Sequence, residues 1–328
     1  MLENVIRAAL GIPFAFVASL LLLVFKPFSN KLLGRDRGKV FVEGSEVNKG
    51  KFTGVGIYFV TVYAVAVISF CYSSFTLGVM MLLMMASSIF GFMDDRSINP
   101  WGEYLKGALD FGVSIVAAIL YVILFGNQIV SPFGNSFYIP SPVYVILAIV
   151  LFIVTINATN ATDGVDGLCG TLTVLSIIAL QVAAAIRGTL GFNGFLVGIL
   201  LVAVLIPYLF FNFYPSKMLM GDAGSRGIGF MIAFYAMYLK IPFAYLIVGL
   251  PFLLDGGISI LKITIGRISD KVFHKKILIL KNIRTPIHDH LKKEKGFTVP
   301  KTYFTICAAA VVIDVIYLLV LFLIKTFN

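Results

Sequence analysis

Long apolar runs dominate the chain and constrain what it can fold into. Of its 328 residues, 59% are hydrophobic and 13% are charged. About 20 consecutive apolar residues suffice for a helix to cross a bilayer. We expect ten such helices, over residues 8–28, 53–72, 74–93, 104–125, 141–159, 167–186, 192–213, 224–239, 241–263 and 302–325. The sequence therefore predicts an all-α integral membrane protein, with residues 1–328 forming a single polytopic domain, and excludes an ordinary soluble domain.

The positions of Lys and Arg predict the orientation of these helices. Residues 30–51 carry six basic side chains and residues 266–301 carry ten, whereas the connections on the other side carry few. Because basic residues gather in cytoplasmic loops, both stretches are expected in the cytoplasm, and ten spans then place both termini outside. The net charge of +10 follows from this topology and from contact with anionic membrane lipid, so it does not indicate nucleic-acid binding.

Within the basic loop 266–301, residues 267–283 mix apolar and basic side chains. Ile268, Val272, Ile279 and Ile283 alternate there with Lys271 and Lys275. This pattern is typical of a helix that lies on a membrane surface, with a solvated basic loop as the alternative.

Four carboxylates stand out because charge is scarce in this chain. Asp94 and Asp95 end the third apolar run, where a negative charge opposes the helix macrodipole, so helix stability does not explain them. Neighbouring residues on a helix point about 100° apart. One of the two could therefore bind a metal or another cation while the other takes a proton.

The connection between the fifth and sixth runs carries amides and acids at a spacing of three residues. Asn157, Asn160, Asp163 and Asp166 would follow one helix face, and Gly164 and Gly167 would let a ligand approach the backbone. Amides suit recognition of a nucleobase or sugar, and carboxylates suit a divalent metal or ribose hydroxyls.

Two further polar clusters fall in loops assigned to the same membrane side. In the segment Asn212–Ser225, Asp222 is a potential Mg²⁺ ligand, and free backbone amides at the start of the following helix could bind phosphate. His288 and His290 would share one side of an extended segment and contact phosphate or a polar substrate. All four clusters lie on the predicted cytoplasmic side, which indicates one common site at that membrane surface.

These motifs resemble the polyprenyl-phosphate N-acetylhexosamine-1-phosphate transferases, in the same order and over nearly the whole chain. The strongest similarity lies in residues 157–168, followed by 211–225, and residues 286–290 resemble a histidine signature of the branch that uses UDP-MurNAc-pentapeptide. The resemblance implies a multi-pass enzyme of the bacterial plasma membrane, with its active site facing the cytoplasm and often a homodimer. Such enzymes transfer phospho-MurNAc-pentapeptide from UDP to undecaprenyl phosphate, with Mg²⁺, giving lipid I and UMP for peptidoglycan synthesis.

The resemblance also implies roles for individual residues. Asp222 would be the leading Mg²⁺ ligand, and Asp94, supported by Asp95, would position or deprotonate the lipid phosphate. His288 would help to hold the substrate. The other substrate-binding residues would be Thr53, Lys106, Asn157, Asn160, Asp166, Asn212, Gly221, Ser225, Lys262 and His290. Because the second pKa of a phosphate monoester is near neutral, direct attack is favoured, and a two-step route through Asp163 as nucleophile stays open.

The chain departs from the family pattern at positions that concern the nucleotide and the peptide more than the metal. They are Asn48, Ile98, Leu219, Lys262 and Asp289. These departures leave open a second donor, UDP-GlcNAc or a related UDP-sugar. An ion-coupled transporter is the alternative from another class, but transporters often show inverted repeats and place their acids near the midplane.

Overall fold

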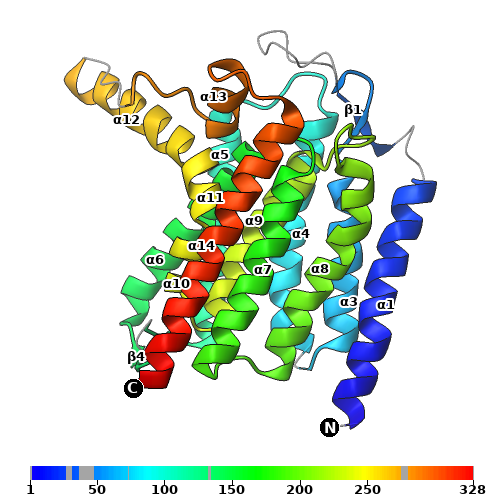
Figure 1. Cartoon of the computed structure of the whole chain (residues 1–328), viewed down its shortest axis with the longest axis vertical. Coiled ribbons are helices and arrows are strands. Elements are labelled where there is room, and N and C mark those ends of the chain that lie inside the picture. Colours follow the sequence, from blue (N-terminus) through cyan, green and yellow to red (C-terminus); the bar gives the residue numbers. More distant parts are fainter. Residues whose placement is uncertain are drawn as a thin grey trace.

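The computed structural model describes residues 2–26, 32–36, 48–72, 74–131, 134–274 and 280–327. It is a bundle of helices running in nearly the same direction, as Figure 1 shows. The helices are α1 (Leu2–Phe25), α3 (Gly56–Phe70), α4 (Ser74–Arg96), α5 (Glu103–Phe125), α6 (Ser141–Thr162), α7 (Leu168–Arg187), α8 (Phe192–Asn212), α9 (Gly221–Tyr238), α10 (Pro242–Val248), α11 (Leu250–Phe252), α12 (Ile258–Phe273), α13 (Ile287–Lys293) and α14 (Val299–Phe327).

Two short antiparallel hairpins lie at opposite ends of the bundle (Figure 1). Strands β1 (Gly34–Arg35) and β2 (Phe52–Thr53) pair with Gly34 opposite Thr53. Strands β3 (Gln128–Val130) and β4 (Ser136–Tyr138) pair with Gln128 opposite Tyr138. Both chain termini lie at the end of the bundle that carries β4, whereas β1 and α13 lie at the other end.

The predicted class, an all-α membrane protein, is confirmed. Each of the ten predicted runs falls on helical structure, and among the described residues seven helices are long and apolar enough to cross a membrane. These are α1, α4, α5, α6, α7, α8 and α14. Helix α3 has 15 residues and begins three residues after the predicted start at about residue 53, because Phe52 and Thr53 form β2. The number of spans and their orientation stay predictions.

The predicted run over residues 241–263 falls on a bent pair of helices. Helix α10 and the helical segment Leu250–Lys271 meet at an angle of 59°. Gly249 and Pro251 stand at the bend, where proline supplies no backbone N–H, and a π-helical turn, Leu253–Gly257, follows. Helix α12 then projects from the bundle (Figure 1), so residues 266–273 of the predicted basic loop are helical. The predicted interfacial helix includes residues 275–279, which lie outside the described residues.

Helix α9 is the centre of the bundle, and its residues Ala223–Met237 are all buried. Glycines allow the neighbouring helices to approach it closely. A Cβ at Gly229 would lie 2.6 Å from the Cα of Ile156 in α6, and a Cβ at Gly56 in α3 would collide with Gly224. At the start of α9, a Cβ at Gly91 of α4 would likewise collide with the Asp222 carbonyl. Helix α9 is therefore packed closely against α3, α4 and α6.

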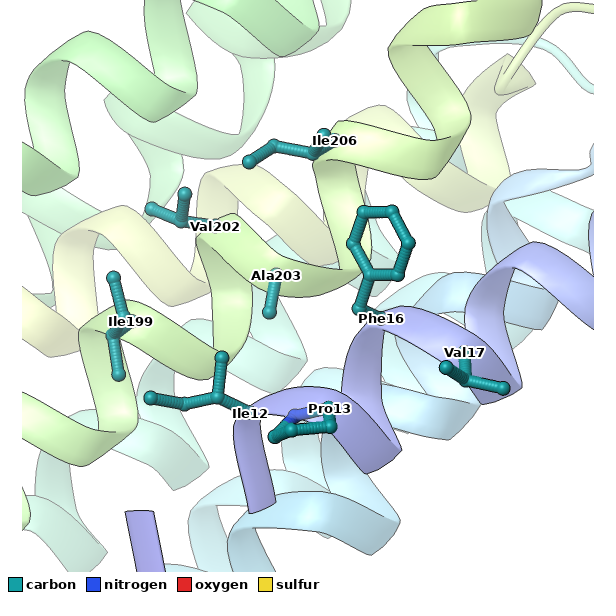
Figure 2. Close-up of a pocket in the computed structure, with 8 residues that line it drawn as sticks. All are labelled: Ile12, Pro13, Phe16, Val17, Ile199, Val202, Ala203 and Ile206. Atoms are coloured by element: carbon teal, nitrogen blue, oxygen red, sulfur yellow. The ribbon is translucent and has the colours of Figure 1, made fainter. Parts of the chain in front are cut away.

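An apolar groove lies between α1 and α8. Figure 2 shows Ile12 and Phe16 of α1 facing Ile199 and Ile206 of α8. The groove has no titratable side chain in its lining, so it supplies no group for proton or phosphate chemistry.

The close packing of α9 predicts that Gly229→Ala lowers the melting temperature of the detergent-solubilised protein. The added methyl group meets backbone atoms of α6, and such overpacking costs about 1–3 kcal/mol. Gly112→Ala is the matched control, because no atom lies within 4 Å of a Cβ at Gly112. Equal melting temperatures for the two variants would contradict the packing.

Candidate active site

Asp95, at the end of α4, caps the start of α9. The backbone N–H groups of Asp222 and Ala223 donate to its Oδ1 and Oδ2 over 3.1 and 3.0 Å. A carboxylate at this position satisfies two unpaired amides and complements the positive end of the helix macrodipole. These are the amides that were predicted to be free for phosphate, so that prediction was wrong.

Asp94 points to different partners from those of Asp95, as their adjacent positions on a helix predict. Its Oδ1 accepts a 2.7 Å hydrogen bond from the backbone N–H of Trp101. Its Oδ2 contacts the ammonium group of Lys106, one turn into α5. The aspartate pair thus combines one helix cap with one carboxylate that faces a cation.

Four helices meet at Asp222 of α9, because Asp95 of α4, Lys106 of α5 and Asn160 of α6 all contact it. Its Oδ1 accepts a 2.8 Å hydrogen bond from Asn160 Nδ2 of α6. Its Oδ2 lies 3.4 Å from Lys106 Nζ and 3.3 Å from Arg226 Nε, one turn further along α9. The Asp222 side chain is 22% exposed, so this carboxylate is held in place and still reaches solvent.

Ser225 and Gly221 complete the surroundings of Asn160. The Asn160 amide also donates to Ser225 Oγ over 2.9 Å, and Ser225 Oγ donates to the Gly221 carbonyl over 3.0 Å. Gly221 has a φ of +66°, and a side chain there would collide with the Asp95 carboxylate. Glycine at this position therefore allows α4 and α9 to meet.

Arg226 and Asp110 form a buried ion pair that sequence reasoning did not assign to the site. Arg226 Nη1 lies 2.5 Å from Asp110 Oδ1, and Asn157 Nδ2 donates to Asp110 Oδ2 over 3.2 Å. The available signal was an acidic residue inside the apolar run 104–125, because an ionisable group within a span marks a functional candidate.

The predicted stripe of amides and acids is divided between a helix and a turn. Asn157 and Asn160 lie on α6, but the helix ends at Thr162, so Asp163 is its C-cap and Asp166 lies in the following turn. Asp166 Oδ2 accepts a 2.9 Å hydrogen bond from the backbone N–H of Ser216. This bond links the 163–167 turn to the connection between α8 and α9.

Asn212 strengthens the link between these two connections. Its Oδ1 accepts a hydrogen bond from the Gly167 amide and its Nδ2 donates to the Met218 carbonyl, each over 2.9 Å. The side chain is buried and engaged with backbone at both ends. In the structure, Asn212 therefore holds two loops together.

Thr53 belongs to a segment that runs beside the start of α9. The Leu219 amide donates to the Phe52 carbonyl over 2.9 Å, and the Gly56 amide donates to the Met220 carbonyl over 3.1 Å. Lys51 Nζ donates to Ser216 Oγ over 2.9 Å. This places Thr53 beside the connection that leads to Asp222.

His288 forms a buried pair with Asp255, a residue that sequence reasoning missed. The His288 amide donates to Asp255 Oδ1 over 2.7 Å, and its Nδ1 lies 2.8 Å from Asp255 Oδ2. A side chain at Gly164 would collide with His288 Nε2, so the ring packs against the turn after α6. An acid inside the apolar run 241–263 was the missed signal.

The predicted extended segment around the histidines is instead helix α13. Helical geometry turns His290 away from His288, and His290 Nδ1 accepts a 3.4 Å hydrogen bond from the Arg284 amide. Between them, Asp289 lies 3.5 and 3.3 Å from Lys292 and Lys293. Burial raises the pKa of Asp289, but His288 and these two lysines outweigh burial and bring it below its usual value.

Lys262 is engaged with a loop. Its ammonium group donates to the carbonyls of Leu280 and Ile283 over 3.3 and 2.9 Å. It therefore ties α12 to the segment that leads into α13.

The carboxylates around Lys106 fit a divalent cation that shares its ligands with a substrate. In the part of the chain that the structure describes, no three His, Cys, Asp or Glu side chains form a ready metal site. However, Asp94 and Asp222 contact the same ammonium group, so the space between them already takes a cation. Mg²⁺ is commonly held by one or two carboxylates and completed by water and phosphate oxygens.

The chain is similar to known transferases. A family model described as glycosyl transferase family 4 matches residues 75–240. A phospho-N-acetylmuramoyl-pentapeptide-transferase of Treponema pallidum (strain Nichols) is 31% identical over 290 residues, covering 81% of this chain and 77% of the relative. One from Streptococcus equi subsp. zooepidemicus (strain H70) is 26% identical over 218 residues, covering 65% and 64%. Since the family model spans half of the chain and includes Asp94, Lys106, Asn160 and Asp222, the chain belongs to glycosyl transferase family 4.

Proposed function

We propose that this protein transfers phospho-MurNAc-pentapeptide from its UDP-activated donor to a polyprenyl phosphate, giving a lipid-linked sugar and UMP. The observation that carries the proposal is the meeting of Asp94, Lys106, Asn160 and Asp222 at one end of the bundle. The names of the relatives give the transferred group, phospho-N-acetylmuramoyl-pentapeptide. With undecaprenyl phosphate as acceptor, the product is lipid I, a precursor of peptidoglycan.

The proposed orientation places this site at the cytoplasmic surface of the bacterial plasma membrane. The basic stretches 30–51 and 266–301 support it, since such stretches favour the cytoplasmic side. The ten runs would then all cross the bilayer, with α9 and the bent α10–α12 segment among them, and both termini would lie outside. A UDP-linked donor is charged and water-soluble, and a polyprenyl phosphate stays in the membrane, so a site at the membrane surface suits both substrates.

Asp222 is the residue that would hold Mg²⁺, and Asp94 faces the same space from α4 through the shared contact with Lys106. When bound, the metal would neutralise charge on the diphosphate and make UMP a better leaving group. The oxygen-only character of these ligands supports a hard cation such as Mg²⁺.

The residues of the chain would mainly position two phosphates. An oxygen of the acceptor phosphate forms a bond to the β-phosphorus, and the bond between that phosphorus and the UMP oxygen breaks. Lys106 would pair with a phosphate oxygen, and Asp94 would orient the acceptor phosphate. Since that phosphate is already largely ionised near neutral pH, direct attack needs no strong base. The two-step alternative uses Asp163 as nucleophile.

The remaining residues would surround the donor. Asn160 and Ser225 would contact the sugar phosphate. Asp166 and Asn212 would shape the uridine region through the loops that they link, with Thr53 beside it. His288, fixed by Asp255, would face the donor from the turn at Gly164, with His290 and Lys262 further towards the peptide.

The donor is tested directly with purified protein, undecaprenyl phosphate and Mg²⁺. UDP-MurNAc-pentapeptide should give UMP and a lipid-linked product, whereas UDP-GlcNAc should give neither at the same concentration. Chromatography of the nucleotide and lipid fractions measures both products. UMP release from UDP-GlcNAc alone would replace the proposed donor by a simple UDP-sugar, which the Leu219 and Asp289 positions leave open.

Asp222→Asn should lower turnover by about 100-fold or more, since it removes the charge that would hold the metal. Asn keeps the shape of the side chain, so the melting temperature should stay within a few degrees. The control is Asp314→Asn, which neutralises a buried acid midway along α14 and should leave turnover unchanged. Full activity of Asp222→Asn would remove Asp222 from the metal site.

A further inference from the structure

A buried guanidinium beneath Asp222 has no part in the proposed transfer step. Arg226 Nε lies 3.3 Å from Asp222 Oδ2, and Arg226 Nη1 lies 2.5 Å from Asp110 Oδ1. The side chains of Arg226 and Asp110 are only 5% and 3% exposed. One arginine thus bridges the carboxylate of the site and a second carboxylate deeper in the bundle.

The position of Arg226 is fixed from three helices. Asp110 Oδ1 of α5 accepts a hydrogen bond from Arg226 Nη1, and Asn157 Nδ2 of α6 donates to Asp110 Oδ2 over 3.2 Å. Asn157 also donates to the Ile153 carbonyl over 3.0 Å, which anchors its amide to its own helix. Because a guanidinium is rigid and does not lose its proton in proteins, Arg226 is a permanent positive charge beside Asp222.

Lys106 differs from Arg226 in ways that matter for a ligand. Its side chain is 23% exposed, and its ammonium ends a flexible four-carbon chain that contacts both Asp94 and Asp222. A ligand that enters from solvent can therefore meet Lys106 directly. Arg226 is buried, so an entering ligand would leave its contacts with Asp110 and Asp222 in place.

A fixed positive charge at this distance opposes a divalent cation at Asp222. Charges a few ångströms apart interact strongly where water is largely excluded. In the free protein, Asp222 Oδ2 already has two cationic neighbours. A diphosphate adds negative charge on the open side, which restores the attraction for the cation.

We propose that Arg226, held by Asp110, is a positioning residue and fixed counter-charge that weakens divalent-cation binding at Asp222 until a nucleoside diphosphate is present. The inference rests on the proposed function, because it takes Asp222 as a ligand of the cation. In this proposal, Arg226 and Asp110 determine the order in which the cation and the donor bind. The cation would enter with the donor rather than before it.

The test is a Mg²⁺ titration of thermal stability in detergent, without acceptor lipid or turnover. In the double variant Arg226→Met/Asp110→Leu, apolar side chains replace the buried ion pair, an exchange that proteins often tolerate well. The pair is neutral overall, but its positive member contacts Asp222 directly, whereas Asp110 contacts a different nitrogen of the guanidinium. Removing both should therefore lower the Mg²⁺ concentration that gives half-maximal stabilisation at least about fivefold relative to wild type. In the wild-type protein, adding UDP should also lower this midpoint, because linkage between the two ligands is reciprocal.

Arg187→Met is the matched control and should not change the midpoint. Arg187 ends α7, and its Nη1 would lie 3.5 Å from a Cβ at Gly134, just before β4. Strand β4 is at the end of the bundle opposite α13 (Figure 1). An unchanged or higher midpoint in the double variant would overturn the proposal and leave the ion pair with a role in stability alone. If the double variant does not fold, Arg226→Gln/Asp110→Asn replaces the ion pair with two neutral amide side chains that can still hydrogen-bond, with the same expected shift. A failed donor assay leaves this titration unaffected, so the two proposals fail separately.

Discussion

The architecture of this protein depends on the capping of α9 by Asp95. The start of α9 brings two amide groups, two glycines and a carboxylate into the middle of the bundle, and Asp95 satisfies both amides from α4. Without that cap, polar backbone groups would be left unpaired among packed helices, which is costly. The same contact fixes the position of Asp222 relative to Asp94. Asp222 is itself one of the two capped residues, and Asp94 directly precedes Asp95, which caps them.

Balanced charge is the second principle of the site. Asp94 and Asp222 share Lys106, Asp222 also contacts Arg226, and Arg226 is paired with Asp110. Every ionised group of this cluster therefore has an opposite partner in the free protein, as buried charges require. The partially exposed side of the cluster, at Lys106 and Asp222, is where a substrate phosphate and its metal can enter. The partly exposed Lys106 can therefore exchange its partners for a ligand, whereas the buried Arg226 stays in its ion pair with Asp110.

The sequence allowed the membrane class, the helical segments and the gathering of the polar clusters to be predicted, because apolar run length and scarce charge are strong physical signals. It did not allow the direction of individual side chains to be predicted. The Asp222 and Ala223 amides were expected to be open, yet a partner 127 residues away in sequence, Asp95, occupies the first of them. Asp110 and Asp255 were passed over because a single acid within an apolar run has no local partner in sequence. Such pairs are visible only when tertiary packing brings them together.

The central claim is that a phosphoryl-sugar unit, and not the sugar alone, moves to the lipid. It is tested by following UDP-MurNAc-pentapeptide labelled with ³²P at either the α or the β phosphate in a reaction with undecaprenyl phosphate. The account predicts that the β label enters the lipid fraction and that the α label remains in UMP. Recovery of both labels in UDP, with sugar on the lipid, would contradict it.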